Sequence, residues 1–139
     1  MTLSNEERQA LVTYRIQRAH EAWAETKTII ENKLWYAATN RMYYSCFYMT
    51  SALLVSHGLT AATHAGVIRM LGLHFVATGK LSNELNRFYI HLFEMRQKGD
   101  YDDYVQITSA DVLPMVIQAE QYMQTLEKLI KENFISLSI

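Results

Sequence analysis

The chain contains few of the residues that crosslink small proteins or interrupt helices. Its 139 residues include one cysteine, Cys46, and one proline, Pro114. A single cysteine excludes a disulfide framework and a cysteine-based zinc site, which fits a reducing compartment. Free cysteine packs as a small hydrophobe, and Cys46 lies within the apolar run RMYYSCFYMTSALL, so we expect it to be buried.

Membrane and export signals are also missing. No apolar stretch approaches the roughly 20 residues needed to span a bilayer. The N-terminal segment MTLSNEERQA is polar and acidic, whereas a signal peptide starts basic and then becomes apolar. We therefore expect a cytoplasmic protein that makes no membrane contact.

Charge is scarce as well. Charged residues make up 19% of the chain, below the typical ~25%, while hydrophobic residues make up 50%. This balance suggests that a partner subunit covers part of the apolar surface. The net charge of -1 gives no overall attraction to nucleic acid, so RNA or nucleotide binding would need a local patch, or one formed where two chains meet.

Several catalytic motifs are absent. The sequence has no G-x-x-x-x-G-K-[ST] phosphate loop and no G-x-G-x-x-G segment, and its serines lack the strand-turn-helix setting of a nucleophile elbow. No two histidines have the helical spacing that presents paired zinc ligands. We therefore predict neither a metal ion nor a cofactor, and the sequence does not favour conventional nucleotide hydrolysis or acyl transfer.

Helical periodicity runs through nearly the whole chain and predicts an all-α protein. Capping and glycine signals divide the chain into five helices, over about 4–32, 34–57, 63–78, 82–98 and from 109 into the 130s. Short connections predict an up-and-down bundle of four to five helices, in a single domain spanning residues 1–139. Pro114 either lies in a first turn, if the last helix starts nearer Asp111, or kinks that helix. The apolar tail FISLSI is expected to dock or pair.

The segment HLFEMRQKGDYDDY is the most informative part of the sequence. At helical spacing, Leu85, Phe88, Leu92 and Arg96 share one stripe, so the arginine occupies a position where another core residue is expected. A guanidinium that points inward needs several acceptors or a wet cleft. Gly99 is expected to break the helix, with Asp100 and Tyr101 following within reach. This corner is either a structural ion pair or a site.

Two further polar positions are candidates for the same site. Asn40 lies on an aromatic stripe of the second helix, where it either makes an inter-helix hydrogen bond or lines a cleft near Arg96. Thr63 is a predicted N-cap with His64 in the first turn, where the helix dipole favours a neutral imidazole. His64 is therefore either a capping histidine or a proton acceptor.

These residue types can bind a phosphodiester without a metal ion. The guanidinium of Arg96 offers paired donors to phosphate oxygens, and His64 could act as a general base toward a ribose 2′-hydroxyl. Asp100, Tyr101 and Tyr104 would order the loop or contact the ligand. The alternative is structural: Arg96 forms a salt bridge with Asp100 or Asp103 and fixes the loop.

Four short segments occur in a recognisable order: YYSCF from Tyr43, THAGV from Thr63, FVATG from Phe75 and RQKGDYD from Arg96. In this order they resemble the HEPN domain superfamily, small α-helical proteins of prokaryotes that often work beside a nucleotidyltransferase. The resemblance runs from about Trp35 to the last helix. It implies a homodimer with a cleft along its two-fold axis. It also implies a role in RNA cleavage or nucleotide binding, commonly within toxin–antitoxin or defence operons.

Ribonuclease members of that superfamily carry an arginine, four to six residues and then a histidine, just before the last helix. By position the arginine is Arg96, but Tyr101 stands where the histidine would follow four intervening residues. A phenol with a pKa near ~10 is a poor base at neutral pH, which puts cleavage by the usual route in question. The pair Arg69 and His74 fits the spacing but lies inside a helix, and Arg87 to His91 is too short.

Two hypotheses follow from the sequence. The first is a homodimeric HEPN-type protein that binds RNA or a nucleotide in a cleft lined by Arg96, as the toxin-like ribonuclease half of a two-gene module. The second is a non-catalytic helical adaptor that binds a nucleotidyltransferase or another protein. Convergence of His64 and Arg96 favours the first hypothesis, and an arginine sealed between Asp100 and Asp103 favours the second.

Overall fold

The computed structural model describes residues 3–138, and the side chains of residues 3–133. The predicted docking of the apolar tail falls outside these side chains. The described elements are all helical: α1 (Asn5–Glu31), α2 (Trp35–Ser56), α3 (His64–Leu71), the π-helix η1 (Gly72–Val76), α4 (Asn83–Tyr101) and α5 (Ser109–Ser138). No strand occurs between residues 3 and 138, so the predicted all-α helical bundle is confirmed. None of the helices in this range is both long and apolar enough to cross a membrane.

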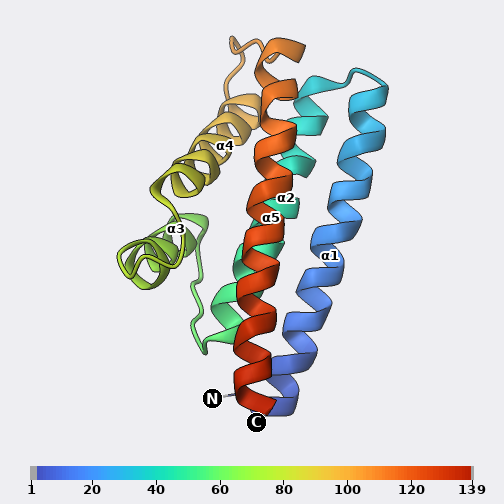
Figure 1. The fold of residues 1–139 in the computed structure, drawn as a ribbon. Helices are drawn as coiled ribbons and strands as arrows, with labels where there is room; N and C mark the ends of the chain where they lie inside the picture. Colours follow the sequence, from blue (N-terminus) through green and yellow to red (C-terminus); the bar gives the residue numbers. More distant parts are fainter. Residues whose placement is uncertain (1–2, 139) are drawn as a thin grey trace.

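Helix α2 is the centre of the bundle. It packs along α1 and also against α4 and α5, so the three long helices α1, α2 and α5 lie side by side, with α1 running opposite to α2 and α5 (Figure 1). The shorter α4 and the α3–η1 segment follow one another along the remaining side. Because α2 has neighbours on most of its circumference, its sequence is apolar or small almost all round, and fourteen of its residues are buried.

The helix ends follow the predicted capping signals. Ser4 and Glu7 form a complete capping box at the start of α1. The Thr63 side chain accepts a hydrogen bond from the Gly66 N–H, which fixes the start of α3 at His64. Gly58 adopts a left-handed conformation directly after α2, with a φ of 72°. These local interactions place the first turn of α3 beside the middle of α2.

One sequence-based expectation about a helix end is wrong. Gly99 does not break α4, which continues to Tyr101. A Cβ atom on Gly99 would lie 2.7 Å from the Cδ1 atom of Ile107, a residue of the loop that follows. The glycine therefore allows the loop to pack against the last turn of α4. The last helix begins at Ser109, as predicted, so Pro114 lies in its second turn and not in the first turn of a helix that starts nearer Asp111.

Three tyrosine rings form the middle of the core. The rings of Tyr43 and Tyr89 stack with centroids 5.9 Å apart, and those of Tyr89 and Tyr122 stack at 5.2 Å. The Tyr122 hydroxyl lies 2.6 Å from the hydroxyl of Thr50 on α2. Cys46 is fully buried beside them, as predicted, and burial raises the pKa of its thiol to about 12. This stack holds the Tyr43 ring in a fixed position.

Candidate functional site

Arg96 points into the protein, as the helical stripe predicts. Its side chain continues the buried row formed by Phe88 and Leu92, and the residue is 5% exposed. The guanidinium carbon lies 4.8 Å from the centroid of the Tyr43 ring and 5.7 Å from that of Phe93. Aromatic faces attract a cation, so these rings compensate part of the cost of burying the charge. The arginine is therefore held in place mainly by rings.

The polar contacts of Arg96 are few for a buried cation. One guanidinium nitrogen, Nη1, lies 3.6 Å from the Asp100 Oδ2 atom, an ion-pair distance that is too long for a hydrogen bond. Among the described residues the guanidinium makes no hydrogen bond, and its Nε atom is buried without a partner. A guanidinium has five N–H donors, and leaving buried donors unused costs free energy. Arg96 thus has donors to spare.

Asn40 and Asp100 meet beside this arginine. The Asn40 amide donates a hydrogen bond to the Asp100 Oδ2 atom at 3.0 Å, which links α2 to the last turn of α4. Asp100 is the carboxylate that pairs with Arg96, and its side chain is 29% exposed. Within the described chain, Asp103 forms no ion pair with the arginine. The carboxylate at the Arg96 guanidinium is therefore shared with an amide and open to solvent on one side.

His64 belongs to the same group of side chains. Its Nδ1 atom lies 2.6 Å from the hydroxyl of Tyr43, and its ring lies 4.6 Å from the ring of Phe47. Burial lowers the pKa of His64, and the nearby Arg96 charge lowers it further, so the imidazole is neutral at pH 7. Burial raises the pKa of Tyr43 to about 12, so that phenol keeps its proton. His64 and Arg96 converge on one ring, Tyr43.

Tyr101 and Tyr104 lie apart from this group. They are 77% and 96% exposed, and both line a shallow hollow of the loop after α4. Tyr101 follows Arg96 by five residues, which at about 100° per residue turns it roughly 140° away around the helix. Tyr104 lies beyond the end of α4, where its backbone N–H donates to Asp102 at 3.1 Å. The structure thus unites Arg96, Asp100, Asn40 and His64 and leaves both tyrosines outside.

Two residues of the site were not singled out from the sequence. Tyr43 supports the Arg96 guanidinium with its ring and contacts His64 through its hydroxyl. Phe93 lies beneath Arg96, three residues before it on α4. The available signal was spacing: Tyr43 follows Asn40 by three residues and therefore lies on the same side of α2. The two alternative arginine–histidine pairs lie elsewhere, since Arg69, Arg87 and His91 are exposed.

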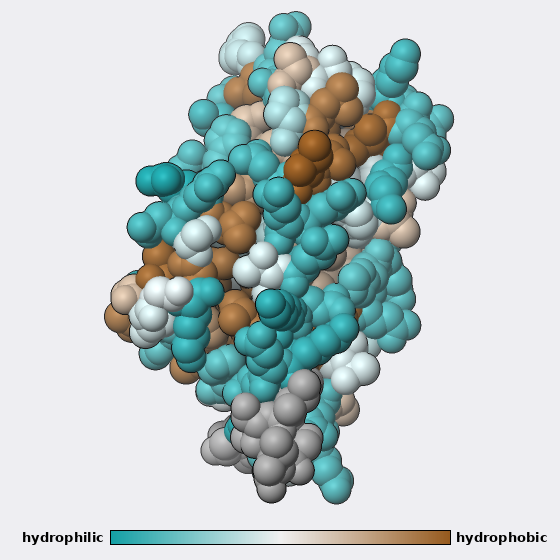
Figure 2. All heavy atoms as spheres, in the orientation of Figure 1, coloured by the Kyte–Doolittle hydropathy of each residue, from teal (hydrophilic) through white to brown (hydrophobic). Residues whose placement is uncertain are grey.

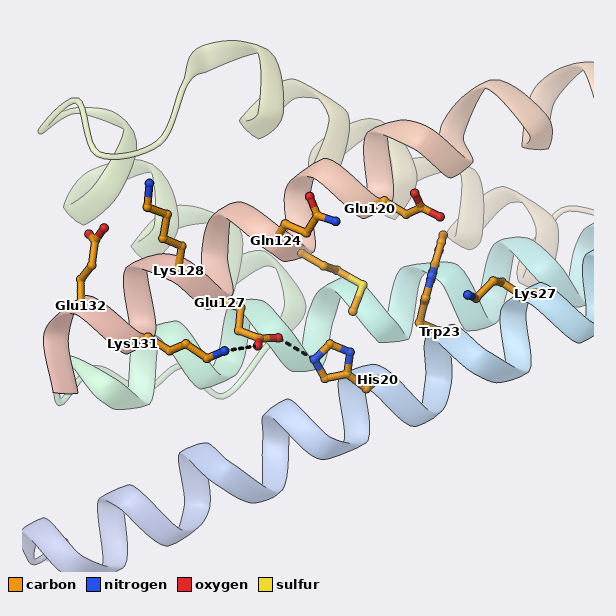
Figure 3. A pocket seen from close by; sticks show the side chains of 10 residues that line it. His20, Trp23, Lys27, Glu120, Gln124, Glu127, Lys128, Lys131 and Glu132 are labelled. Carbon is orange, nitrogen blue, oxygen red and sulfur yellow. Dashed lines mark hydrogen bonds and ion pairs between the residues drawn. The ribbon is translucent and has the colours of Figure 1, made fainter. Parts of the chain in front are cut away.

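A separate cavity of about 730 Å³ lies between α1 and α5 (Figure 3). Its apolar floor includes Trp23, and its charged rim carries lysines and glutamates. Glu127 accepts from Lys131 at 2.9 Å and lies 2.5 Å from the His20 Nε2 atom. We call this cavity the α1–α5 groove.

In the view of Figure 1 the surface is mostly hydrophilic, with a hydrophobic area toward the upper ends of α1 and α5 (Figure 2).

The groove and the Arg96 site are chemically different. Opposite charges in the groove neutralise one another in contact with water, whereas Arg96 is buried beside a loosely held carboxylate. No three His, Cys, Asp or Glu side chains come together as a metal site in the described part of the chain. Of these two places, the Arg96 site is therefore the one that could hold an anion, through the guanidinium of Arg96 and the imidazole of His64.

Comparison with known proteins assigns the family. The model of the HEPN domain matches residues 12–132, and the chain belongs to this family. A UPF0332 protein from Thermotoga maritima is 36% identical over 126 residues, covering 91% of this chain and 96% of its own length. "Putative toxin MJ0605" from Methanocaldococcus jannaschii is 35% identical, covering 91% of both chains. "Putative toxin MJ0142" from the same organism is 26% identical over 86% of this chain and 82% of its own length.

Proposed function

We propose that this protein is the toxin-like member of a two-gene module and binds RNA through a backbone phosphate at Arg96. The observation that carries the proposal is the buried guanidinium with unused donors beside a neutral imidazole. Guanidinium groups bind phosphate oxygens through paired hydrogen bonds. The names of two relatives support the toxin-like role. The proposal places the protein in the cytoplasm, with a nucleotidyltransferase as the product of the neighbouring gene.

Ligand binding at Arg96 would proceed by exchange of anions. Asp100 pairs with the guanidinium at 3.6 Å and is also held by Asn40 at 3.0 Å. An RNA phosphate offers more acceptors than this one carboxylate oxygen, and it can hydrogen-bond directly where Asp100 does not. The phosphate would displace the Asp100 side chain toward solvent, the direction in which that side chain is already exposed. In this proposal Asp100 pairs with Arg96 only while no phosphate is bound.

His64 would supply a second donor to the phosphate. The buried phenol of Tyr43 needs an acceptor for its proton, and Nδ1 of His64 lies 2.6 Å from the phenol oxygen. If the phenol donates to Nδ1, the neutral ring carries its own proton on Nε2. That N–H can donate to a phosphate oxygen. The lowered pKa of His64 keeps the ring in this neutral form at pH 7.

A homodimer would complete the cleft. In a single copy of the protein Arg96 is 5% exposed, so the surrounding side chains cover most of it and leave no open cleft. Two copies related by a two-fold axis would place two Arg96 and His64 pairs on either side of a shared groove. The low charged fraction, 19%, is compatible with an apolar surface that a second copy covers.

RNA cleavage is a second candidate, favoured by the neutral imidazole near the arginine. In the alternative tautomer, Nδ1–H donates to the Tyr43 oxygen, and Nε2 can accept the proton of a ribose 2′-hydroxyl. The 2′-oxygen would then attack phosphorus, forming a 2′,3′-cyclic phosphate and releasing the 5′-oxygen, which takes up a proton. Arg96 would hold the non-bridging oxygens. No metal ion enters this step, and Tyr101 takes no part in it.

The adaptor hypothesis is favoured by a different observation. The ion pair of Arg96 with Asp100 and the hydrogen bond of Asp100 with Asn40 link α4 to α2. The only role of these three side chains could be to fix the loop after α4. In that case Arg96 would never leave Asp100, and the protein would act by binding another protein. The two hypotheses differ in whether RNA reaches the guanidinium.

The test is an RNA-binding and RNA-degradation assay with wild-type protein and the Arg96→Ala variant. Arg87→Ala is the matched control, because Arg87 lies on the same helix and is exposed. We expect wild type and Arg87→Ala to bind a single-stranded RNA equally, and Arg96→Ala to lose at least about tenfold in affinity. Equal binding by all three proteins would leave the adaptor hypothesis. Intact RNA after incubation with wild type would exclude the cleavage candidate and keep the binding proposal.

A further inference from the structure

A row of arginines follows the seam between α1 and α2 and leads toward Arg96. Helices α1 and α2 are antiparallel, and three arginines of α1 lie in register beside α2. Arg8 lies beside Gly58, Arg15 bonds to Ser51 and Arg18 bonds to Tyr48. Arg41 of α2 extends the row at the other end. We call this surface the arginine–tyrosine face and define it by Arg8, Arg15, Arg18, Arg41, Tyr44 and Tyr48.

Tyrosine rings hold several of these guanidinium groups in place. The guanidinium carbon of Arg18 lies 5.2 Å from the centroid of the Tyr48 ring, and its Nη2 atom donates to the Tyr48 hydroxyl at 3.3 Å. Arg15 donates a hydrogen bond to the Ser51 hydroxyl. A stacked or bonded arginine loses less side-chain entropy when it binds a ligand than a freely moving one. The row is therefore partly ordered before any ligand binds.

One tyrosine connects the row to the Arg96 site. The guanidinium carbons of Arg41 and Arg96 each lie 5.6 Å from the centroid of the Tyr44 ring. The ring of Tyr44 lies 6.0 Å from that of Tyr48, which carries Arg18. A long ligand bound at Arg96 could thus also contact Arg41 and then Arg18.

The face carries more positive than negative charge. Arg18 pairs with Glu21 at 3.3 Å, and Arg41 pairs with Glu25 at 3.5 Å. Arg8 and Arg15 have no carboxylate within 4 Å among the residues whose side chains are described. The chain as a whole has a net charge of -1, so this excess is a local property of the face. Local excess positive charge attracts the phosphates of a nucleic acid.

We propose that the arginine–tyrosine face binds a single-stranded RNA that leads away from the phosphate at Arg96. This inference rests on the proposed function and adds how far the bound RNA extends along the protein surface. From Arg41 to Gly58 the seam covers seventeen residues of rise, about 25 Å, which is long enough for several nucleotides of a single strand. Tyr14 is 57% exposed and four residues before Arg18, so one base could stack on its ring.

Single-stranded RNA fits this face better than a second copy of the chain does. A two-fold contact through the face would bring arginines against arginines, and like charges in contact are unfavourable. A double helix presents its phosphates in two rows, whereas the face offers one row of cations along one seam. The lysines of the α1–α5 groove alternate with glutamates and provide no such row. At about 100° per residue, these groove residues lie on the opposite side of α1 from Arg15 and Arg18.

The experiment measures the affinity of the full chain for two 2′-O-methyl RNA probes, a dinucleotide and an unstructured 12-mer, which lack the 2′-hydroxyl needed for cleavage. The test variant is R15A/R18A. Its control is K128A/K131A, which removes two positive charges from the opposite side of the protein. We expect R15A/R18A to bind the 12-mer about tenfold more weakly and the dinucleotide like wild type. The salt dependence for the 12-mer should fall by about 1.4 in logarithmic slope, ~0.7 for each lost phosphate contact.

The outcomes separate this inference from the proposed function. If R15A/R18A binds the 12-mer like wild type while R96A weakens both probes, the face does not bind RNA and the proposed function stands. If R96A changes neither probe, the proposed function fails. A fall in molecular mass of R15A/R18A by light scattering, with unchanged 12-mer affinity, would show that the face covers a second copy and would overturn the inference. Should R15A/R18A not fold, R15Q/R18Q replaces it and keeps polar contacts to α2.

Discussion

The α1–α5 groove and the Arg96 site both contain cations and carboxylates, yet they hold their charges in opposite ways. In the groove, Lys131 lies 2.9 Å from Glu127 at a surface where the lysine side chain is 67% exposed (Figure 3). At the Arg96 site, the cation is 5% exposed and its carboxylate lies at 3.6 Å. Water screens the first pair and makes it weak, whereas the second leaves a desolvated charge with unused donors. A large cavity is thus a poorer guide to an anion site here than one poorly partnered buried cation.

The largest expected effect comes from removing the buried charge. Arg96→Met keeps much of the side-chain volume without the guanidinium, so we expect RNA affinity to fall by at least about tenfold while the protein becomes more stable by about 1 kcal/mol. Unfolding in urea and RNA titration measure the two effects. Lys131→Met in the groove is the control, with a change in stability within ~0.5 kcal/mol and unchanged RNA affinity. A strongly destabilised Arg96→Met variant would show that the arginine is structural.

The next effect concerns the carboxylate that covers the arginine. Asp100→Ala removes a competing anion, so RNA affinity should rise a few-fold, while the loss of the Asn40 and Arg96 contacts should lower the stability by about 1 kcal/mol. Glu127→Ala makes the same change in the groove and should leave RNA affinity unchanged. Calorimetric titration with a short RNA measures both variants. Weaker RNA binding by Asp100→Ala would contradict the exchange of Asp100 for phosphate.

The smallest effect is a pH dependence from His64. Its pKa in the folded protein is lowered by burial and by Arg96, so the unfolded chain binds a proton more readily. Stability should therefore fall as the pH drops through and below the ordinary value of about 6.5. RNA affinity should rise over the same range, because the protonated ring adds a positive charge beside Arg96.

His57, whose pKa burial also lowers, contributes to the same loss of stability, so the comparison variant is His64→Gln. Thermal unfolding and RNA titration between pH 5 and 7.5 in this variant should show a weaker pH dependence of stability and no rise in affinity. An unchanged rise in affinity would assign the effect to another group.

The inward arginine could be predicted from the sequence because helical spacing fixes which side of α4 Arg96 occupies. The Thr63 cap likewise predicted that His64 lies in the first turn of α3, but the contact of His64 with Tyr43 on α2 depends on how the helices pack. An inter-helix hydrogen bond of Asn40 was expected as one of two alternatives. Its partner Asp100, 60 residues away, was not predicted, since spacing within a helix does not report contacts between helices.

Other features depend on tertiary packing and had no local signal. Gly99 was expected to end α4, but its role is to let Ile107 approach the helix, and only the folded loop reveals that contact. The support that Tyr43 gives to both Arg96 and His64 depends on the crossing of three helices. Tyr101 was a candidate because it occupies the family's histidine slot, yet α4 continues through it and turns it toward solvent. The π-helix at Gly72–Val76 also had no sequence signal.

The most direct measurement is the NMR signal of the Arg96 Nε–H group, assigned by comparison with Arg96→Met, during titration with a 2′-O-methyl dinucleotide. This donor has no hydrogen-bond partner among the residues whose side chains the structure describes, so a bound phosphate that uses the guanidinium should shift its resonance in a saturable way. The Nε–H signal of the exposed Arg87 should stay in place. Saturable binding of the dinucleotide with no movement of the Arg96 signal would contradict a phosphate site at this residue.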